Sequence, residues 1–407
     1  MRIGLFTDTY PPYINGVSTS VSMLKKALEK EGHQVFLVTS NDDNHKYCFE
    51  ENNKVIRIPG IKTWIYGYRL TKVYPIRLLK TIKKWRLDVI HSHTEFGVGT
   101  FARIVAKQFN IPLVHTYHTM YEDYVHYVTR GYFNHSSRKI VEYLTLFYCD
   151  KTATELIVPT KKTYDLFKEK YQVNRNVHIV PTGIEVERFY KENINFSKLK
   201  KIKTEYNLSD QNFVLIFVGR LAEEKNVIYL LNIIKDVYKD IKNIKLLIVG
   251  DGPDKEKFIK HAKKIGIEKQ TIFTGFVPWE EVPLYYHLAD AFITPSTSET
   301  QGLTVIEAMA AEKIPICIND DAFNKVVING LNGYLFNDPK ECEKIIKDVY
   351  YNQDNKNDKL KNQARITAEE NSSKTYATNA LRVYRHAIRN KKGRFGFLSK
   401  IIETIRR

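Results

Sequence analysis

The chain has 407 residues, of which 43% are hydrophobic and 27% are charged. This length and composition are typical of a globular protein with two or three domains. No apolar run approaches the ~18 residues of a membrane-spanning helix, and the first residues show no leader pattern, so we expect a cytosolic protein. Four widely spaced cysteines without a CxxC pair argue against a disulfide framework or a thiolate zinc site.

The net charge of +17 is concentrated in two segments. Residues 57–86 contain nine Lys or Arg and no acid, and residues 382–407 contain nine Lys or Arg and one acid, so the remaining chain is neutral. A basic surface of this kind attracts nucleic acid, a phosphate-bearing substrate or an anionic membrane.

Both basic segments interleave their cations with apolar residues at helical spacing. Either these stripes pack on the core, as in ordinary surface helices, or they enter a membrane interface while the cations contact lipid headgroups. The second interpretation predicts the membrane-binding residues Arg69, Lys72, Arg77, Lys80, Lys83, Lys84, Trp85, Phe395, Phe397, Lys400, Arg406 and Arg407.

Apolar runs alternate with helical patterns along most of the chain. After a first strand at residues 2–7 and a helix at 17–30, the first half has predicted strands at 34–39, 88–91, 113–116 and 156–159. The second half has predicted strands at 213–218, 245–249, 271–273, 291–294 and 314–318, and a mainly helical end from about residue 340. This alternation predicts two similarly built α/β halves with parallel sheets and a cleft between them.

The strongest chemical signal is the pair Glu299 and Glu307, separated by seven residues. Glu299 follows a predicted strand, and Glu307 lies in the first turns of the helix that comes next. The N–H groups of Leu303 and Thr304, with Gly302 allowing a ligand to approach closely, would form an anion site suited to a diphosphate. The alternative is that both glutamates only offset the helix macrodipole. The surrounding loop and helix favour the anion site.

Two cations follow the predicted strand at residues 213–218. Arg220 could make a bidentate contact, and Lys225 a point-charge contact, with a diphosphate whose negative charge grows as a bond breaks. The alternative is a charged surface turn. The glutamate loop in the same half of the chain favours the phosphate site.

Histidines follow two predicted strands of the first half. The pairs His91/His93 and His115/His118 have spacings that metal sites also use. An enzyme for a charged diphosphate, however, needs hydrogen-bond donors at these strand ends, and the chain has no Asp-x-Asp pair. We therefore predict no metal ligands and no required cofactor, with Mg²⁺ at most an activator. We assign His118 to a substrate hydroxyl in preference to simple packing.

Together these residues resemble the retaining glycosyltransferases of family 4, which have the GT-B fold. The resemblance extends over nearly the whole chain and is carried by Asn15-Gly16-Val17, His118, Gly219-Arg220, Glu224-Lys225-Asn226, Gly250-Asp251-Gly252-Pro253, Gly275-Phe276-Val277, Glu299 with Glu307, and Asn332-Gly333. It implies two Rossmann-like domains facing a cleft, with C-terminal helices crossing back to the first domain. We expect an acceptor- and membrane-facing domain at residues 1–185, a nucleotide-sugar domain at 186–375 and a basic helical tail at 376–407.

The resemblance also implies residue roles. Arg220 and Lys225 hold the nucleotide diphosphate, Glu307 the ribose and Val277 the base. Glu299 contacts the sugar. The other implied nucleotide-sugar residues are Gly16, Gly302, Leu303 and Thr304, and the implied catalytic residues are His118, Glu299, Arg220 and Lys225.

Within the family, four motifs are similar to bacterial 1,2-diacylglycerol 3-glucosyltransferases: residues 6–12, 93–96 and 117–121, and the Thr300-Gln301-Gly302 variant. These enzymes make monoglucosyldiacylglycerol from UDP-glucose at the cytoplasmic face of the cell membrane. The resemblance thus implies a peripheral protein with UDP-sugar, diacylglycerol and anionic lipids as partners, and no nucleic acid. One alternative is another lipid-linked or soluble acceptor. The other is a non-enzymatic nucleic-acid or membrane-binding module, which leaves the two glutamates beside two cations unexplained.

Overall fold

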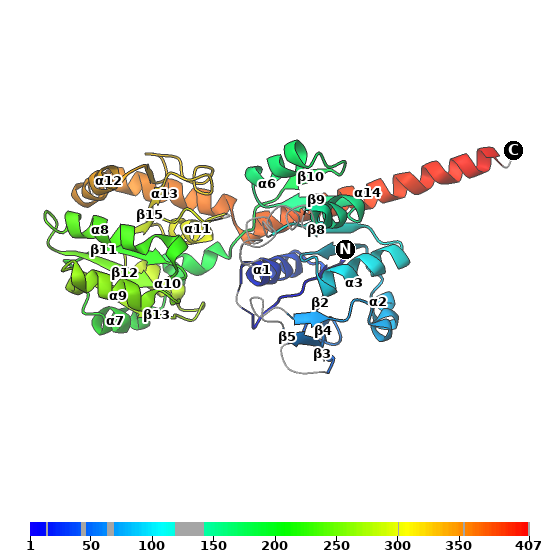
Figure 1. The fold of residues 1–407 in the computed structure, drawn as a ribbon, viewed down its shortest axis with the longest axis horizontal. Coiled ribbons are helices and arrows are strands. Elements are labelled where there is room, and N and C mark those ends of the chain that lie inside the picture. Colours follow the sequence, from blue (N-terminus) through cyan, green and yellow to red (C-terminus); the bar gives the residue numbers. More distant parts are fainter. Residues whose placement is uncertain are drawn as a thin grey trace, which may run out of the picture. The chain divides into compact units, whose positions relative to one another are not determined.

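The computed structural model describes residues 1–13, 15–41, 46–62, 69–118, 142–299, 301–352 and 355–405, without the side chains of 62, 355–356 and 392–405. The chain divides into two compact units. Unit 1 comprises Met1–Gly183 and Ser373–Arg407, and unit 2 comprises Ile184–Ser372 (Figure 1). Each unit is built around a mainly parallel sheet, so the predicted α/β class with two similarly built halves is confirmed.

Unit 1 contains an eight-stranded sheet in the order β10-β9-β8-β7-β1-β2-β4-β3, in which β3 and β4 are the antiparallel pair. Its strands are β1 (Arg2–Phe6), β2 (Gln34–Ser40), β3 (Cys48–Glu50), β4 (Val55–Ile58), β7 (Val89–Ser92), β8 (Leu113–Thr116), β9 (Glu155–Val158) and β10 (Val177–Ile179). A separate antiparallel pair joins β5 (Gly60–Lys62) and β6 (Arg69–Thr71). The short strands β3 to β6 were not predicted, because three or four residues carry too little periodicity.

Helices cover both faces of this sheet. The helices α1 (Gly16–Lys30) and α14 (Ser373–Ile405) contribute to the core on one face, and α2 (Leu79–Trp85) and α3 (Gly97–Gln108) to the core on the other. Burial on both faces explains why β1 and β2 are nearly continuous apolar runs. The short helix α6 (Lys161–Asp165) follows β9.

The C-terminal helix α14 belongs to unit 1 and is not a separate domain. Its residues Tyr376, Tyr384 and Ala387 are buried in the core with α1. The Tyr384 hydroxyl lies 2.7 Å from His91 Nδ1, and the Tyr376 hydroxyl lies 3.1 Å from Ser20 Oγ. The predicted return of the C-terminal helices to the first domain is therefore confirmed.

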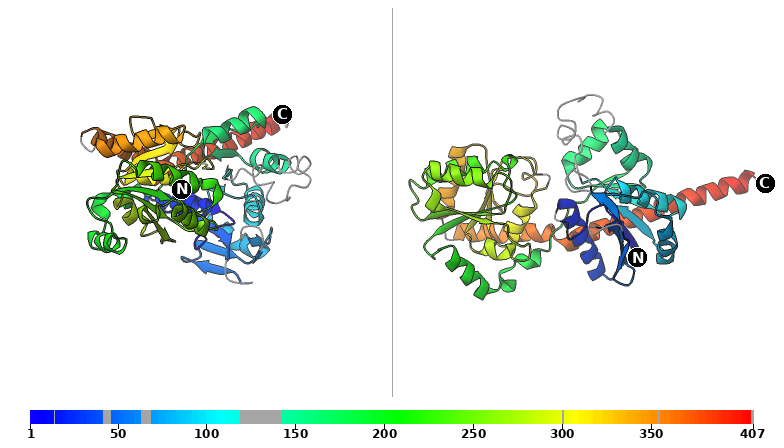
Figure 2. Two further views of the ribbon diagram at one scale, coloured as in Figure 1. Left: turned by 60° about the vertical axis from the view of Figure 1, so that its left-hand side comes forward. Right: turned by 60° about the horizontal axis from the view of Figure 1, so that its bottom comes forward.

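The last part of α14 continues beyond the sheet of unit 1, as Figures 1 and 2 show. The predicted membrane contacts in this part are not tested by the structure. The side chains of Phe395, Phe397 and Lys400, and the whole of Arg406 and Arg407, lie outside the described residues.

Unit 2 contains a six-stranded parallel sheet in the order β13-β12-β11-β14-β15-β16. Its strands are β11 (Phe213–Val218), β12 (Ile244–Val249), β13 (Thr271–Gly275), β14 (Ala291–Thr294), β15 (Ile314–Ile318) and β16 (Tyr334–Phe336). Its helices are α7 (Phe196–Glu205), α8 (Val227–Val237), α9 (Lys255–Lys264), α10 (Val282–His287), α11 (Leu303–Ala310), α12 (Pro339–Tyr351) and α13 (Asn355–Glu370). The helices α8, α9 and α12 close the main core on one face of the sheet.

The apolar stripe of α2 packs inside unit 1. Trp85 is only 6% exposed, stacks on Phe36 with ring centroids 4.9 Å apart, and donates from Nε1 to the Asn53 carbonyl at 3.1 Å. Leu78 and Ile82 are also buried. The prediction that Trp85 inserts into a membrane is therefore wrong, because this face of the helix completes the protein core.

The cations of the same segment stay at the surface. Arg69 is half-buried and donates from Nη1 to the Gly60 carbonyl. The exposed cations of the segment are Lys72, Arg77, Lys80, Lys83, Lys84 and Arg86.

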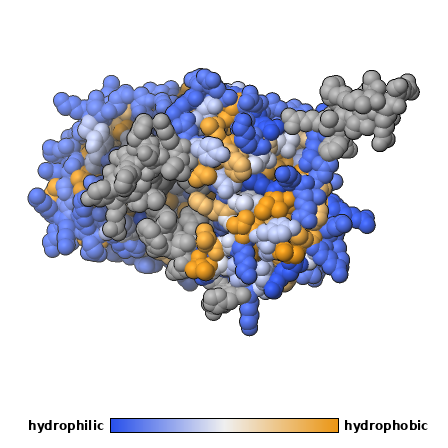
Figure 3. Space-filling model, turned by 45° about the vertical axis from the view of Figure 1, so that its right-hand side comes forward, coloured by the Kyte–Doolittle hydropathy of each residue, from blue (hydrophilic) through white to orange (hydrophobic). Residues whose placement is uncertain are grey.

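A second apolar set in this segment is exposed. It consists of Ile61, Leu70, Val73, Tyr74 and Ile76, which are between 41% and 73% exposed and which we call the hairpin patch. Ile61 and Leu70 are paired across β5 and β6, so they project from the same face. Figure 3 shows that hydrophobic side chains gather beside hydrophilic ones on an exposed face of the molecule. In the described parts of the chain, no helix is both long enough and apolar enough to cross a membrane.

Candidate active site

The residues predicted to bind a nucleotide sugar in the second half follow the carboxyl ends of strands in unit 2. Arg220 and Lys225 follow β11, Val277 follows β13, and Glu299 follows β14. The strands β11 and β14 are neighbours in the sheet. This edge is where open α/β sheets bind ligands. The predicted placement at strand ends is confirmed, whereas the ligand roles stay predictions.

Lys225 and Glu299 form an ion pair that joins the loops after β11 and β14. Lys225 Nζ lies 2.6 Å from Glu299 Oε1, which also accepts from Ser296 Oγ at 3.1 Å. The two loops are further held by the Asn226 side chain, which donates to the Pro295 carbonyl. Glu299 is therefore paired with Lys225, the cation that we predict to bind the diphosphate. A bound phosphate would compete with the Glu299 carboxylate for the Lys225 amine.

The loop before α11 is shaped by Gly302. Its φ is +66°, and a Cβ at this position would lie 2.7 Å from the Phe323 ring. The positive φ and the contact with Phe323 both require glycine here. The sequence analysis gave a different reason, which was the close approach of a ligand. Leu303 and Thr304 are the first two residues of α11, and their N–H groups have no preceding helical carbonyl to donate to. Thr300 lies outside the described residues.

Glu307 lies on α11 and is held by Tyr286, whose hydroxyl is 2.9 Å from Glu307 Oε2. Burial raises the pKa of Glu307 to about 7, although the Tyr286 hydrogen bond and the charge of Arg188 both lower it. The carboxyl thus changes its charge near neutral pH. Sequence reasoning found Glu307 but missed Tyr286, because the contact joins α10 to α11.

We expect Glu307→Gln to raise the donor KM about tenfold with little change in kcat, because a ribose contact exists in both the ground and the transition state. An ionised carboxylate accepts a ribose hydroxyl more strongly. In the wild type the donor KM should therefore fall as the pH rises from 6 to 8 through the raised pKa of Glu307.

Steady-state kinetics across this range would check the prediction. Glu307→Gln should abolish the pH dependence, and Tyr286→Phe should move it to higher pH by removing a bond that lowers the pKa. The same slope in Glu307→Gln as in the wild type would contradict the assignment of Glu307 to the ribose.

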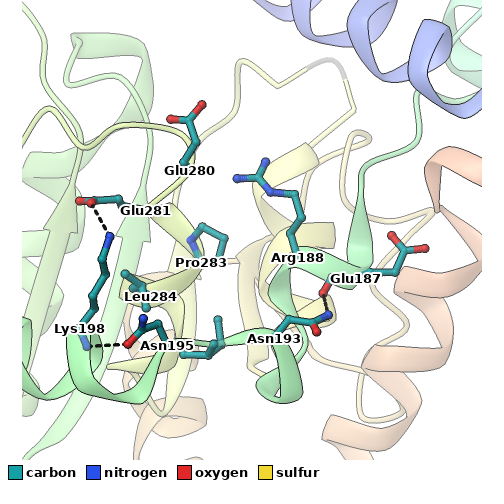
Figure 4. A pocket seen from close by; sticks show the side chains of 10 residues that line it. Glu187, Arg188, Asn193, Asn195, Lys198, Glu280, Glu281, Pro283 and Leu284 are labelled. Atoms are coloured by element: carbon teal, nitrogen blue, oxygen red, sulfur yellow. Dashed lines mark hydrogen bonds and ion pairs between the residues drawn. The ribbon is translucent and has the colours of Figure 1, made fainter.

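Arg188 borders a separate pocket of ≈ 460 Å³ in unit 2 (Figure 4). Its guanidinium lies over the Trp279 ring and donates to the Trp279 carbonyl at 3.1 Å. Within the described part of the chain its Nη1 is buried without a hydrogen-bond partner. The pocket is lined by Glu187, Arg188, Asn193, Ile194, Asn195, Lys198, Glu280, Glu281, Pro283 and Leu284. None of the predicted nucleotide-sugar residues lines it, and Arg188 influences the site through its charge, which lowers the pKa of Glu307.

The histidines of the first half lie at the carboxyl ends of β7 and β8, which are neighbours. His118 is half-buried, and its Nε2 lies 3.0 Å from His93 Nδ1. Burial lowers the pKa of His118 to about 4, so the imidazole is neutral at pH 7. A neutral ring can donate to or accept from a substrate hydroxyl, as predicted for His118.

His93 is a residue that the sequence analysis did not assign to the site. It is 1% exposed, its ring stacks with that of His118, and no described residue hydrogen-bonds its Nε2. The His-x-His spacing placed His93 at a strand end. Its contact with His118 could not be predicted, because that contact depends on the pairing of β7 with β8.

Asp8 at the end of β1 is a second missed residue. Its carboxylate accepts from the Val98 N–H at 2.9 Å and from Thr94 Oγ1 at 2.6 Å. Burial raises the pKa of Asp8 to about 6. This carboxylate holds the start of α3 at the sheet edge that carries the histidines. In the sequence, Asp8 could have been noticed as the acid that ends the first apolar run.

Gly16 begins α1, just after Asn15, whose side chain caps the helix by accepting from the Ser18 N–H at 2.8 Å. A Cβ on Gly16 would meet no atom of the described residues within 4 Å. Packing against the described residues therefore does not require a glycine here, and the predicted approach of a ligand is compatible with this. Gly16 and His118 belong to unit 1, and the other predicted donor-binding residues belong to unit 2.

Comparison with known families gives two matches that together cover most of the chain. Residues 14–188 match the family model described as Glycosyltransferase Family 4, and residues 199–367 match that of Glycosyl transferases group 1. The chain is 37% identical over 405 residues to the alpha-monoglucosyldiacylglycerol synthase of Acholeplasma laidlawii, covering 96% of this chain and 99% of that protein. It is also 37% identical over 338 residues to the synthase of the same name from Streptococcus pneumoniae, covering 83% and 75%.

Solved structures show the same fold at low sequence identity. HepE of Anabaena, crystallised with UDP, has a TM-score of 0.70 at 16% identity and covers 95% of this chain and 100% of its own. WaaG, a glycosyltransferase involved in lipopolysaccharide biosynthesis, has a TM-score of 0.68 at 16% identity, covering 94% and 99%.

Proposed function

We propose that this chain, which belongs to the family 4 glycosyltransferases with the GT-B fold, transfers glucose from UDP-glucose to the 3-hydroxyl of 1,2-diacylglycerol. The transfer retains the configuration at the anomeric carbon of the glucose. The product would be α-monoglucosyldiacylglycerol. The observation that carries this proposal is the 37% identity over 96% of the chain to a synthase of that name. The cations Arg220 and Lys225 after β11 support it, because positive charge at this sheet edge suits a nucleotide diphosphate.

The chemistry follows from charge development at the leaving group. As the bond between sugar and diphosphate breaks, negative charge grows on the phosphate oxygens, and Arg220 and Lys225 stabilise it. In a front-face retaining transfer the leaving diphosphate takes the proton of the acceptor hydroxyl. Glu299 and His118 would orient the sugar by hydrogen bonds to its hydroxyls. No step needs a metal ion, and Mg²⁺ would act only as an activator.

The test is an assay with anionic liposomes that contain diacylglycerol and a panel of radiolabelled nucleotide sugars. We expect glucose transfer from UDP-glucose and an α linkage in the NMR spectrum of the product. A β linkage would contradict retention. Faster transfer to a soluble sugar or a lipid-linked oligosaccharide would replace the proposed acceptor while leaving the family assignment intact.

We further propose that the protein binds the cytoplasmic face of the cell membrane as a peripheral protein. Diacylglycerol has almost no aqueous monomer, so its enzyme must work at an interface. The exposed cations Lys72, Arg77, Lys80, Lys83 and Lys84 lie in the same segment of the chain as the hairpin patch. Each such cation contributes about 1 kcal/mol at an anionic surface, and full burial of an Ile or Leu side chain contributes about 1.5–3 kcal/mol.

The membrane proposal predicts two separable parts of binding. The electrostatic part should be lost at high salt. The apolar part should be lost in Ile61→Ser/Leu70→Ser/Ile76→Ser, whose three side chains are 61–73% exposed and leave the core unchanged. Removing residues 392–407 should weaken binding without abolishing it.

Liposome flotation at low and high salt, with and without anionic lipid, measures both parts. Ile366→Ser/Leu331→Ser, which alters two exposed apolar residues of unit 2, is the matched control and should float as the wild type does. Equal recovery on zwitterionic and anionic vesicles at low salt would show that the basic residues are an ordinary solvated surface.

A further inference from the structure

Three side chains of unit 1 converge away from both sheet edges described above. Glu155 is the first residue of β9, His178 lies in β10, and His386 lies on α14. Each offers one ligating atom, and the three atoms lie within 4.8 Å of one another. Among the described residues, no other group of three or more Asp, Glu, His or Cys side chains brings its ligand atoms this close together. The histidines at the ends of β7 and β8 do not form such a group.

The two histidines approach the same carboxylate from different sides. His178 Nε2 lies 2.8 Å from Glu155 Oε2, and His386 Nδ1 lies 3.0 Å from Glu155 Oε1. The two rings are edge to face, with centroids 5.6 Å apart. In a tetrahedral zinc site with bonds of about 2.0–2.1 Å, neighbouring ligand atoms are about 3.3 Å apart. The three ligand atoms of the cluster lie within 4.8 Å of one another, so shifts of about 1.5 Å or less would bring them to this spacing.

The carboxylate of the cluster is buried and held by a further hydrogen bond, whereas the two histidines are partly exposed to solvent. The Glu155 side chain has no exposed surface, whereas the side chains of His178 and His386 are 28% and 46% exposed. Asn390 donates to Glu155 Oε1 at 2.7 Å, which fixes the orientation of the carboxylate from outside the ligand set. An ion can therefore enter from solvent, and a water molecule can complete its coordination.

We propose that Glu155, His178 and His386 form a binding site for one divalent transition-metal ion of the zinc class, with water as the remaining ligand. Two imidazoles and one carboxylate suit Zn²⁺, Co²⁺ or Ni²⁺, whereas Mg²⁺ and Ca²⁺ prefer oxygen ligands alone. The site is structural. Glu155 lies at the amino end of its strand, opposite to the edge that carries the catalytic candidates, so glycosyl transfer without a metal and this site are compatible.

The ion would join α14 at His386 to the strands β9 and β10 of unit 1. Lys391, five residues after His386 on the same helix, donates from Nζ to the Ile111 carbonyl at 2.7 Å. A bond from the ion to His386 would add a strong link to β9 and β10 at this place. It would therefore stabilise unit 1 and fix the origin of the basic C-terminal segment.

The experiment uses full-length, tag-free protein stripped with a chelator and then titrated with Co²⁺ or Zn²⁺. We expect one equivalent of Co²⁺ to give the visible absorption of a four-coordinate ion. Zn²⁺ at about 100 times its Kd should raise Tm by about 5 °C or more, and Mg²⁺ should have no such effect. His386→Ala and His178→Ala should each abolish the absorption band and the Tm shift.

His261→Ala is the matched control, because His261 is another surface histidine, bonded to Asn232 and remote in sequence from the cluster. It should bind Co²⁺ as the wild type does. Glu155→Gln tests the buried ligand, and if this variant fails to fold, the two histidine variants still decide because their side chains are partly exposed. Absence of a saturable Co²⁺ band in the wild type, or an unchanged band in His386→Ala, would show that the three residues form only a hydrogen-bonded cluster.

Discussion

Lys225→Ala should lower kcat by about 10²-fold or more while the protein stays folded. The amine is the cation that we assign to the diphosphate, and the charge that it stabilises grows as the glycosidic bond breaks. Lys225 is only partly exposed, and its amine contacts the side chains of Ser298 and Glu299 in the loop after β14. Its charge is therefore held at the predicted diphosphate site. Arg220→Ala should also lower kcat. Arg220 is exposed, follows the same strand β11 as Lys225 and is assigned to the same diphosphate.

Steady-state kinetics with UDP-glucose and diacylglycerol in mixed vesicles would measure this effect, with the thermal transition recorded to confirm folding. Lys257→Ala is the control, since Lys257 is an exposed lysine on α9 of the same unit. Near-normal kcat in Lys225→Ala would show that the diphosphate site is assigned to the wrong residues.

Glu299→Gln should lower kcat by about 10²-fold and, at the same time, tighten the binding of UDP. The carboxylate lies 2.6 Å from Lys225 Nζ, so it competes with a phosphate for that cation. Removing a partly exposed ion-pair partner releases about 1 kcal/mol of this competition, which corresponds to roughly fivefold in affinity. The loss in kcat has a different origin, because Glu299 is also assigned to the transferred sugar.

Calorimetric titration with UDP separates the two effects, since UDP carries the phosphates without the sugar. Glu224→Gln controls for the change in local charge, because Glu224 is exposed and stands next to Lys225 in the chain. Unchanged UDP affinity in Glu299→Gln would mean that the ion pair does not oppose phosphate binding. Unchanged kcat would remove Glu299 from the sugar contacts.

Local patterns in the chain were sufficient for the architecture and for half of the site. Strands buried on both faces must be continuous apolar runs, so β1, β2, β11 and β14 could be recognised without knowing their neighbours. A ligand site at the carboxyl edge of a parallel sheet lies directly after such runs. Arg220, Lys225 and Glu299 could therefore be placed at strand ends, and Glu307 on the helix after the loop, from sequence position alone.

The rest depended on contacts between segments that are distant in sequence. The stripe of α2 is equally compatible with a protein core and with a membrane, because an apolar face does not specify what covers it. The tertiary structure, in which Trp85 packs on Phe36 and Ile82 is buried, shows that it faces the core. The pairing of β7 with β8 brings His93 to His118, and the return of α14 to unit 1 brings His386 to Glu155. Such side chains meet because strand order and helix crossing place them together, and neither is encoded in the spacing of any single segment.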